Sequence, residues 1–210
     1  MSGRVHLRGK SSAAAHASLR GMLGSVLHLA YTFDEYVRFE RETKDKHEFV
    51  HGAILAMAGG TIEHGALCAA IVGMLRQQLR GRRCRVFDSN ARLRVAASGN
   101  AYYPDASVVC GTLDADPSDA LSITNPTVVV EVLSPSTAAY DTGEKLTDYQ
   151  RIASLQHVVV VHQETQRVEV HTRSGSEFSV ATFGPGEDAR LAELDITVSV
   201  DELYFDPLKA

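Results

Sequence analysis

A glutamate inside an apolar segment is the feature of this sequence that points most directly to chemistry. Glu131 interrupts the run from Val128 to Leu133, and a continuous apolar run of this length is typical of a central strand covered on both faces. A buried, ionised carboxylate is costly unless a cation pairs with it. Glu131 therefore needs a partner, which is either a metal ion or a buried Lys or Arg in a structural ion pair.

Two further acids stand where neighbouring strands begin. Asp105 follows Pro104 at the head of an apolar segment, and Glu48 opens the first predicted strand. Brought together with Glu131, they would form an oxygen-rich site suited to Mg²⁺ or Mn²⁺. Such an ion lowers the pKa of a bound water and stabilises charge on a phosphoryl oxygen. Taken singly, Asp105 is equally a turn residue after proline and Glu48 a solvated charge, so only their joint occurrence favours a metal site.

A lysine follows these acids in the segment from Asp141 to Tyr149. As a functional residue, Lys145 is a cation that orients an attacking water or stabilises developing negative charge. The alternative is an i,i+4 salt bridge from Lys145 to Asp141 on an exposed helix face. The residues alone favour the salt bridge.

The elements that must position these residues follow from periodicity and capping signals. The spacing of Thr32 and Glu35 predicts a capping box and a helix to about residue 42. Apolar residues at three- and four-residue spacing predict a second helix, and alternating or apolar segments predict strands. The sequence predicts an α/β (α+β) fold with a mixed β-sheet flanked by helices. The predicted helices are 62–79, 143–152 and 200–204, the predicted strands are 48–57, 84–87, 91–95, 105–110, 128–133, 158–161, 167–172 and 178–182, and 111–125 is a predicted loop.

Composition limits the class of protein. The 210 residues carry a formal charge of −5, 44% hydrophobic and 22% charged residues, which fits one globular domain over residues 31–210. Residues 1–30 are basic and rich in Ala, Ser and Gly, so we expect a poorly ordered arm there, or a basic DNA-binding tail. No apolar segment is long enough to span a membrane, and a cytoplasmic location is expected. Cys68, Cys84 and Cys110 form no CxxC pair, which predicts buried free thiols in a reducing compartment.

Four segments together resemble a known family. They are EFVHGAILAMAGGTIEH at 48–64, YPDASVV at 103–109, NPTVVVEVLSPST at 125–137 and DTGEKLTDY at 141–149. Over residues 31–173 the chain resembles the Uma-type family of putative restriction endonucleases, part of the PD-(D/E)XK nuclease superfamily. The resemblance implies a restriction-endonuclease-like core and metal-dependent hydrolysis of phosphodiester bonds.

The resemblance also implies a set of site residues. Carried over by position, Asp105 and Glu131 are metal ligands, and the backbone carbonyl of Val132 is an additional ligand. Glu48 matches the acid of the first helix or strand and holds the metal directly or through water. The implied cofactor is Mg²⁺ or Mn²⁺, and the implied partner is nucleic acid, with DNA favoured over RNA.

The lysine and a few neighbours depart from the commonest pattern. The superfamily lysine usually falls two residues after the second acid, where this chain has Leu133. Lys145 matches those members in which the lysine has moved to the following helix. The chain has His51-Gly52 where Asp-Gly is frequent, Asn90 where Asp is common and Gln150 where Arg is common. None of these departures removes a predicted ligand.

Weaker signals concern nucleic-acid contact and other chemistry. His47, His51 and His64 could indicate zinc, but a strand context at His51 argues against HxxxH geometry, and only His64 matches a family position. Ser134 lacks the GxSxG elbow of a hydrolase nucleophile. A cluster of basic residues predicts a phosphate-contacting face, with a solvated helix end and an outward strand face as the equal alternative. The cluster comprises Arg76, Arg80, Arg82, Arg83, Arg85, Arg92 and Arg94.

Two rival functions use the same residues. The first is a catalytically inactive nuclease fold that binds DNA or a protein, and the second is a structural protein in which Glu131 and Lys145 form an internal salt bridge. The retained acids and lysine favour the endonuclease. A homodimer is expected by analogy, because cleavage of both strands often uses two sites.

Overall fold

A computed structural model of the chain describes residues 30–57, 59–134 and 138–209. The basic segment predicted as an N-terminal arm lies outside these residues, apart from Ala30. Ser136 and Thr137 of the resemblance motif also lie outside them. The description below concerns the compact unit that begins at Tyr31.

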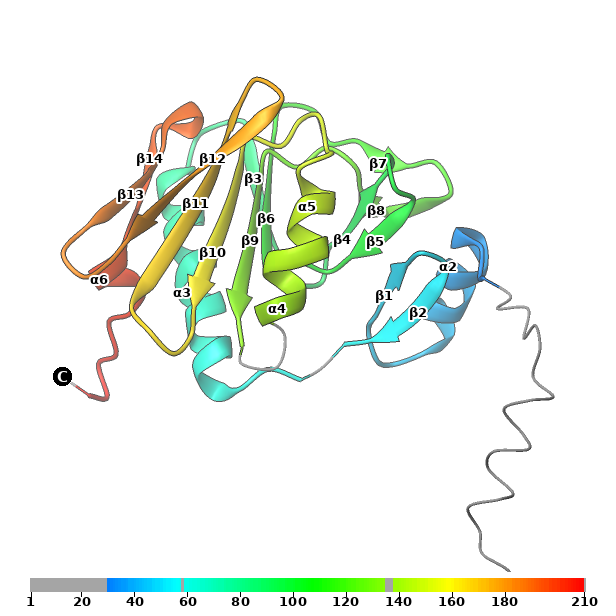
Figure 1. Ribbon diagram of the computed structural model, residues 1–210, viewed down its shortest axis with the longest axis horizontal. Helices are drawn as coiled ribbons and strands as arrows, with labels where there is room; N and C mark the ends of the chain where they lie inside the picture. The colour runs from blue at the N-terminus through cyan, green and yellow to red at the C-terminus, as the bar shows by residue number, and fades with distance from the viewer. Residues whose placement is uncertain (1–29, 58, 135–137, 210) are drawn as a thin grey trace, which may run out of the picture. The chain divides into compact units, whose positions relative to one another are not determined.

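The site is built on a six-stranded mixed sheet (Figure 1). Its central strand β9 (Val128–Leu133) is buried along its whole length, which confirms the prediction from its apolar run. β9 pairs in parallel with β10 and antiparallel with β6, and the remaining pairs are antiparallel. In sheet order, the other strands are β12 (Glu177–Phe183), β11 (Arg167–Ser174), β10 (His157–His162), β6 (Ala106–Cys110) and β3 (Cys84–Asp88).

A second six-stranded sheet carries Glu48 on its strand β1. It includes two short strands in the segment that we predicted as a loop, so that prediction was wrong. There, Arg92 donates to Asp119 and Ser122 and ties the segment to the neighbouring strand. In order, the sheet holds β2 (Ala53–Ala56), β1 (His47–Val50), β5 (Asn100–Tyr102), β4 (Arg92–Val95), β8 (Asp119–Ile123) and β7 (Ala115–Asp116).

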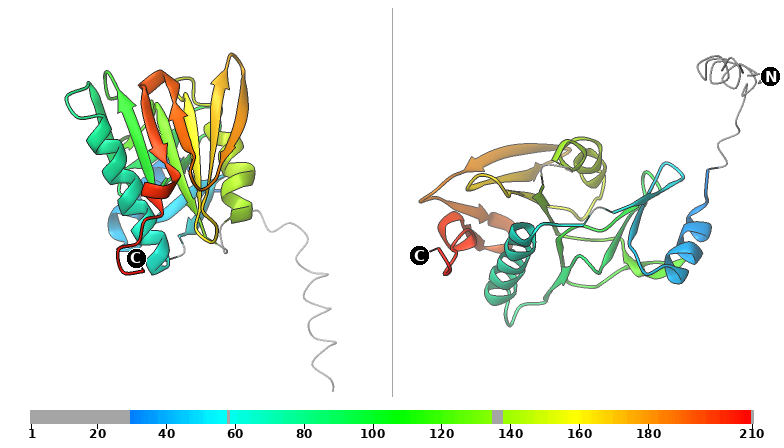
Figure 2. Two further views of the ribbon diagram at one scale, coloured as in Figure 1. Left: turned by 90° about the vertical axis from the view of Figure 1, so that its left-hand side faces the viewer. Right: turned by 90° about the horizontal axis from the view of Figure 1, so that it is seen from below.

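Helices cover the two faces of the β9 sheet (Figure 2). The long helix α3 (Ile62–Gln78) packs Leu67, Ile71 and Leu75 against one face. A kinked helical segment packs on the opposite face, where Leu146 and Tyr149 contact valines of β9 and β10. This mixed sheet flanked by helices is the predicted fold class. The kinked segment comprises α4 (Ala138–Tyr140), a π-helical turn η1 (Asp141–Lys145) and α5 (Leu146–Tyr149).

The remaining elements complete the unit. Helix α2 (Phe33–Glu42) begins with the predicted capping box, in which Thr32 and Glu35 cap each other. β13 (Asp188–Leu191) and β14 (Ile196–Ser199) form a separate pair around a 3-10 turn η2 (Ala192–Leu194). The predicted final helix is α6 (Val200–Leu203).

The β1–β2 hairpin turns at the position where the family frequently has Asp-Gly. His51 and Gly52 have φ values of 50° and 79°, as the two central residues of a type I′ turn require. Histidine is one of the few residues other than glycine that enter this region readily. The departure at His51 therefore preserves the hairpin that presents Glu48.

The prediction of three free thiols was wrong for two of them. Cys84 and Cys110 lie directly opposite each other on β3 and β6 and form a disulfide. They are separated by 26 residues, so only the register of the two strands reveals the pairing. Cys68 on α3 is the free cysteine.

Candidate active site

The strand pair β6–β9 opens at the point where the candidate site begins. The last paired residues are Ala106 and Val130. Beyond them, the Asp105 carboxylate accepts a hydrogen bond of 2.7 Å from the backbone N–H of Val132. The carboxylate thus accepts the hydrogen bond that the backbone of a neighbouring strand would otherwise accept. Asp105 therefore lies beside the open edge of β9.

Lys145 lies at the centre of three carboxylates. Its Nζ is 3.0 Å from Oε1 of Glu131, 3.0 Å from Oε1 of Glu48 and 3.3 Å from Oδ1 of Asp141. All four residues are nearly buried, with exposed fractions of 4–6%. The i,i+4 contact with Asp141 exists, but it lies on a buried face instead of the exposed one considered from the sequence.

The kink in the helical segment positions Lys145. Gly143 has non-helical backbone angles, and the chain passes through a π-helical turn before α5 begins at Leu146. The helix we predicted over 143–152 therefore begins earlier and ends earlier. The Arg173 guanidinium donates to the carbonyls of Gln150 and Ile152, which follow the end of α5.

Tyrosine hydroxyls hold the two glutamates in place. Tyr149 donates a hydrogen bond of 2.7 Å to Oε1 of Glu131, and Tyr140 donates one of 3.0 Å to Oε2 of Glu48. The backbone N–H of Tyr103 also donates to Glu48. Each glutamate therefore has a neutral donor in addition to the lysine, which fixes its orientation.

The cluster contains more negative than positive charge. Burial raises the pKa of Glu131 to about 8, and the nearby Asp105 and Asp141 raise it against the opposing effect of Lys145. Burial alone lowers the pKa of Lys145, but Glu131, Glu48 and Asp141 outweigh it and hold that pKa well above its ordinary value. A buried excess of carboxylate is the electrostatic environment that a divalent cation neutralises. The residues present therefore fit a hard metal ion.

A cavity of about 930 Å³ gives access to the cluster. It is lined by Glu48, Asp105, Glu131, Lys145 and His64, together with backbone of the β2–α3 connection. The structure thus brings together every predicted site residue, and Val132 lines the same cavity. Lys145 lies between Glu131 and Glu48.

A family model of putative restriction endonucleases, Uma2, matches residues 33–201. The chain belongs to the Uma2 family. Two relatives from Synechocystis sp. (strain ATCC 27184 / PCC 6803 / Kazusa) are the uncharacterized proteins slr1290 and sll1609. They are 30% and 31% identical to this chain over 81% and 76% of its length, and each match covers 90% of the relative. Both the matched range and these identities support the resemblance inferred from the four motifs.

A solved structure supports the fold. A putative nuclease belonging to DUF820 from Anabaena variabilis ATCC 29413 superposes on this chain with a TM-score of 0.69 and 18% sequence identity. The match covers 82% of this chain and 97% of that nuclease. The mixed α+β architecture of this Uma2 member is therefore that of a restriction-endonuclease-like fold. No helix in the described residues is long and apolar enough to cross a membrane.

Several residues of this Uma2 site were not predicted from the sequence. Tyr140 lies five residues before Lys145, and Tyr149 lies four residues after it. The four-residue spacing places Tyr149 on the same helix face as Lys145, so this signal could have predicted Tyr149. Cys68 was interpreted only as a buried thiol. In the structure its Sγ lies 3.5 Å from Nδ1 of His64, one helical turn away.

Of the three histidines considered for zinc, two pair with glutamates. Nδ1 of His47 is 3.1 Å from Glu40, and His51 is paired with Glu144. His64 contacts Asp105 instead, with 3.4 Å between Nε2 and Oδ2. The hydrogen bond with Asp105 raises the pKa of His64, so His64 belongs to the site.

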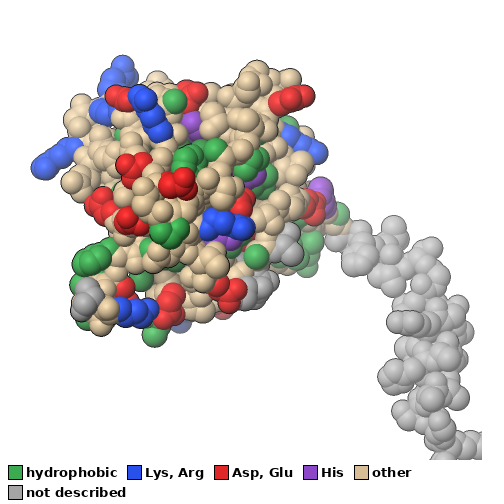
Figure 3. Space-filling view, turned by 60° about the vertical axis from the view of Figure 1, so that its left-hand side comes forward, with side chains coloured by type: hydrophobic (Ala, Val, Ile, Leu, Met, Phe, Trp, Pro, Cys, Tyr) green, Lys and Arg blue, Asp and Glu red, His purple; other side chains and the backbone are tan. Residues whose placement is uncertain are grey.

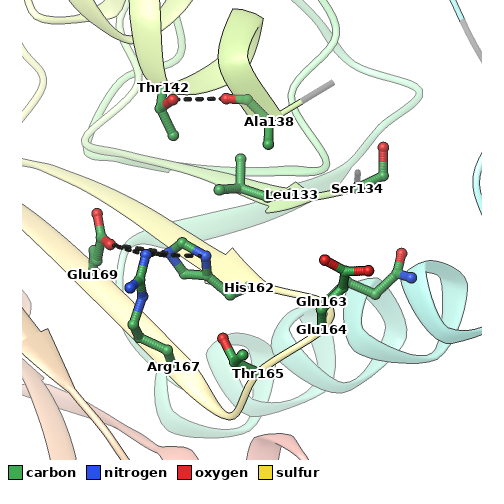
Figure 4. A pocket seen from close by; sticks show the side chains of 10 residues that line it. All are labelled: Leu133, Ser134, Ala138, Thr142, His162, Gln163, Glu164, Thr165, Arg167 and Glu169. Atoms are coloured by element: carbon green, nitrogen blue, oxygen red, sulfur yellow. Dashed lines mark hydrogen bonds and ion pairs between the residues drawn. The ribbon is translucent and has the colours of Figure 1, made fainter. Parts of the chain in front are cut away.

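A second pocket of about 570 Å³ adjoins the ends of β9 and β10 (Figure 4). Three of its ionisable side chains pair with one another: Oε1 of Glu169 lies 3.0 Å from His162 and 2.8 Å from Arg167. Ser134 lines both pockets. Because the predicted acids and lysine line the other cavity and not this pocket, we place the candidate centre in the cavity of Lys145.

The predicted basic face is not one continuous surface. Arg92 is buried and paired with Asp119, and Arg94 is paired with Asp116 beneath Phe33. The other five arginines are exposed and lie at the last turn of α3, after it and on β3. Figure 3 shows acidic and basic side chains interspersed on the face that it draws.

Proposed function

We propose that this Uma2 member is a metal-dependent endonuclease that hydrolyses phosphodiester bonds, with DNA as its substrate. The observation that carries the proposal is the buried lysine held between Glu131 and Glu48 beside Asp105. Family membership supports nuclease activity, and the surplus of buried carboxylate supports a divalent cation.

The proposed metal ligands are hard oxygen donors. Asp105 and Glu131 supply carboxylate oxygens, Val132 supplies its backbone carbonyl, and Glu48 acts directly or through water. When bound, Mg²⁺ or Mn²⁺ lowers the pKa of a water and offsets the charge that grows on the phosphate. The carboxylates of Asp105, Glu131 and Glu48 would hold that ion.

Lys145 acts as a fixed cation in this proposal. Its pKa lies well above the ordinary value, so the ammonium is charged at neutral pH and donates hydrogen bonds. It orients the attacking water and stabilises developing negative charge. The sequence-based mechanism also has Lys145 help deprotonate that water, and the raised pKa in the metal-free protein favours its positioning role.

The deciding experiment is cleavage of plasmid and oligonucleotide DNA with Mg²⁺ or Mn²⁺. We expect wild type to cut, and we expect Asp105→Ala and Lys145→Ala each to lower the rate by a factor of about 100 or more. His51→Asn, which replaces an exposed histidine outside the cluster with a residue that also tolerates positive φ, is the matched control. Wild type that cuts nothing, or variants that cut as fast as the control, would overturn the mechanism.

A metal-dependent thermal shift separates the endonuclease from a structural protein. A ligand that binds only the folded form raises the melting temperature, so we expect Mg²⁺ or Mn²⁺ to stabilise wild type but not Asp105→Ala. Binding of DNA without cleavage would instead indicate an inactive binding module. Sedimentation of the protein with and without a DNA duplex tests the expected homodimer.

A further inference from the structure

A second set of potential metal ligands lies on the α3 side of Asp105. His64 and Cys68 are four residues apart on α3, so their side chains share one face of the helix. Nε2 of His64 is 3.4 Å from Oδ2 of Asp105 and 4.0 Å from Sγ of Cys68. Each of the three residues offers one ligand atom, and these three atoms lie within 4.8 Å of one another. Among the described residues, this trio is the group of His, Cys, Asp or Glu side chains that meets this distance.

The spacing of the trio fits a tetrahedral ion. With metal–ligand bonds of about 2.3 Å to sulfur and about 2.0 Å to nitrogen or oxygen, neighbouring ligands lie about 3.3 to 3.6 Å apart. The His64–Asp105 distance falls in this range, and the His64–Cys68 distance exceeds it slightly. Glu131 and Glu48 do not form a group of this kind with Asp105, because Lys145 lies between the two glutamates.

The loop before α3 packs closely on the histidine. A Cβ at Gly60 would lie 2.8 Å from Nδ1 of His64, so the glycine permits this close approach. Asp105, which His64 contacts, accepts a hydrogen bond from the backbone N–H of Val132 on β9. His64 is thus confined between the loop, Cys68 and β9, with Nε2 directed toward Asp105.

We propose that His64, Cys68 and Asp105 form a second metal position that takes a transition-metal ion of the Zn²⁺ or Co²⁺ class. Thiolate and imidazole ligands select such ions, whereas Mg²⁺ prefers oxygen ligands. Three protein ligands leave one tetrahedral position open to water. The site shares Asp105 with the proposed endonuclease centre, but it does not require nuclease activity.

The test is titration of metal-free wild type with Co²⁺. We expect one equivalent of Co²⁺ to produce the near-ultraviolet absorption of a cobalt thiolate. Added Zn²⁺ should abolish this absorption, whereas millimolar Mg²⁺ should not. Cys68→Ser should remove this absorption, and His64→Asn should weaken Co²⁺ binding by about tenfold or more. Glu131→Gln and His51→Asn should retain it, since neither residue belongs to the trio.

Three outcomes would overturn the second metal position. The first is that folded wild type shows no thiolate absorption although its single free thiol titrates in denaturant. The second is that the absorption survives in Cys68→Ser. The third is that the absorption is lost in Glu131→Gln while circular dichroism shows that this variant stays folded. The result is independent of the proposed function. Absorption without DNA cleavage would support the site and refute the endonuclease, whereas cleavage without absorption would do the reverse.

Discussion

At the scale of single residues, the site is defined by a charge imbalance that its own side chains do not cancel. One buried ammonium faces three carboxylates, with Asp105 close by. Breaking such a cluster leaves uncompensated buried charge, and keeping it costs desolvation. Sites of this kind commonly reduce stability for the sake of function, which leads to measurable consequences at Glu131 and Tyr149.

The hydroxyl of Tyr149 should act as a positioning group for Glu131. Tyr149→Phe removes the 2.7 Å hydrogen bond to that carboxylate while keeping the ring in the core. We expect Mn²⁺ affinity to fall by about tenfold, as for other residues that orient a metal ligand. Isothermal titration measures the change. Tyr102→Phe is the matched control, because its hydroxyl donates to Asp148 instead, and equal losses in both variants would contradict the positioning role.

The raised pKa of Glu131 predicts the pH dependence of stability without metal. The ordinary value of 4.5 applies to the unfolded chain and about 8 to the folded protein. Between these values the folded state binds the extra proton, so this contribution is complete below pH 4.5 and is lost as pH rises through about 8. The free energy of unfolding is measured by urea denaturation in the presence of a chelator. Between roughly pH 5 and pH 9, wild type should lose more of this free energy than Glu131→Gln does. Parallel curves for the two proteins would contradict this.

At the scale of elements, the site depends on where pairing stops and where a helix kinks. Glu131 could be predicted because an acid in an apolar strand needs a partner. Lys145 could not be predicted from its own segment, because the kink at Gly143 that buries it has no periodic signal. The resemblance to the family supplied it. Likewise, β8 and the Cys84–Cys110 bridge depend on contacts between segments distant in sequence, which local patterns do not encode.

The disulfide between β3 and β6 should stabilise the sheet that carries Asp105. Its cysteines are 26 residues apart, and closing a loop of that length in the unfolded chain contributes about 3.5 kcal/mol. The double variant Cys84→Ala/Cys110→Ala should lose about that much free energy of unfolding in urea. Cys68→Ala is the control for removal of a cysteine outside the bridge. An unchanged midpoint on reduction of wild type would show that the bridge does not form.

At the scale of the whole described unit, the exposed arginines and the candidate site lie at opposite ends of α3. His64 is in the first turn of this 17-residue helix, and Arg80 and Arg83 follow its last turn. At 1.5 Å per residue the helix is about 25 Å long. A nucleic acid that touched both ends would therefore span several base pairs along the molecule.

This distance separates binding from chemistry in a testable way. If the exposed arginines contact phosphates, Arg80→Ala/Arg83→Ala should reduce the slope of log affinity against log salt by about 2, since each contact contributes about 0.9. Lys145→Ala, which alters a buried ammonium, should leave the slope unchanged. Fluorescence anisotropy with a labelled duplex across a salt series measures both variants in the presence of Ca²⁺. An unaltered slope in the double variant would show that these arginines form a solvated helix end, and the substrate would then approach over the cavity alone.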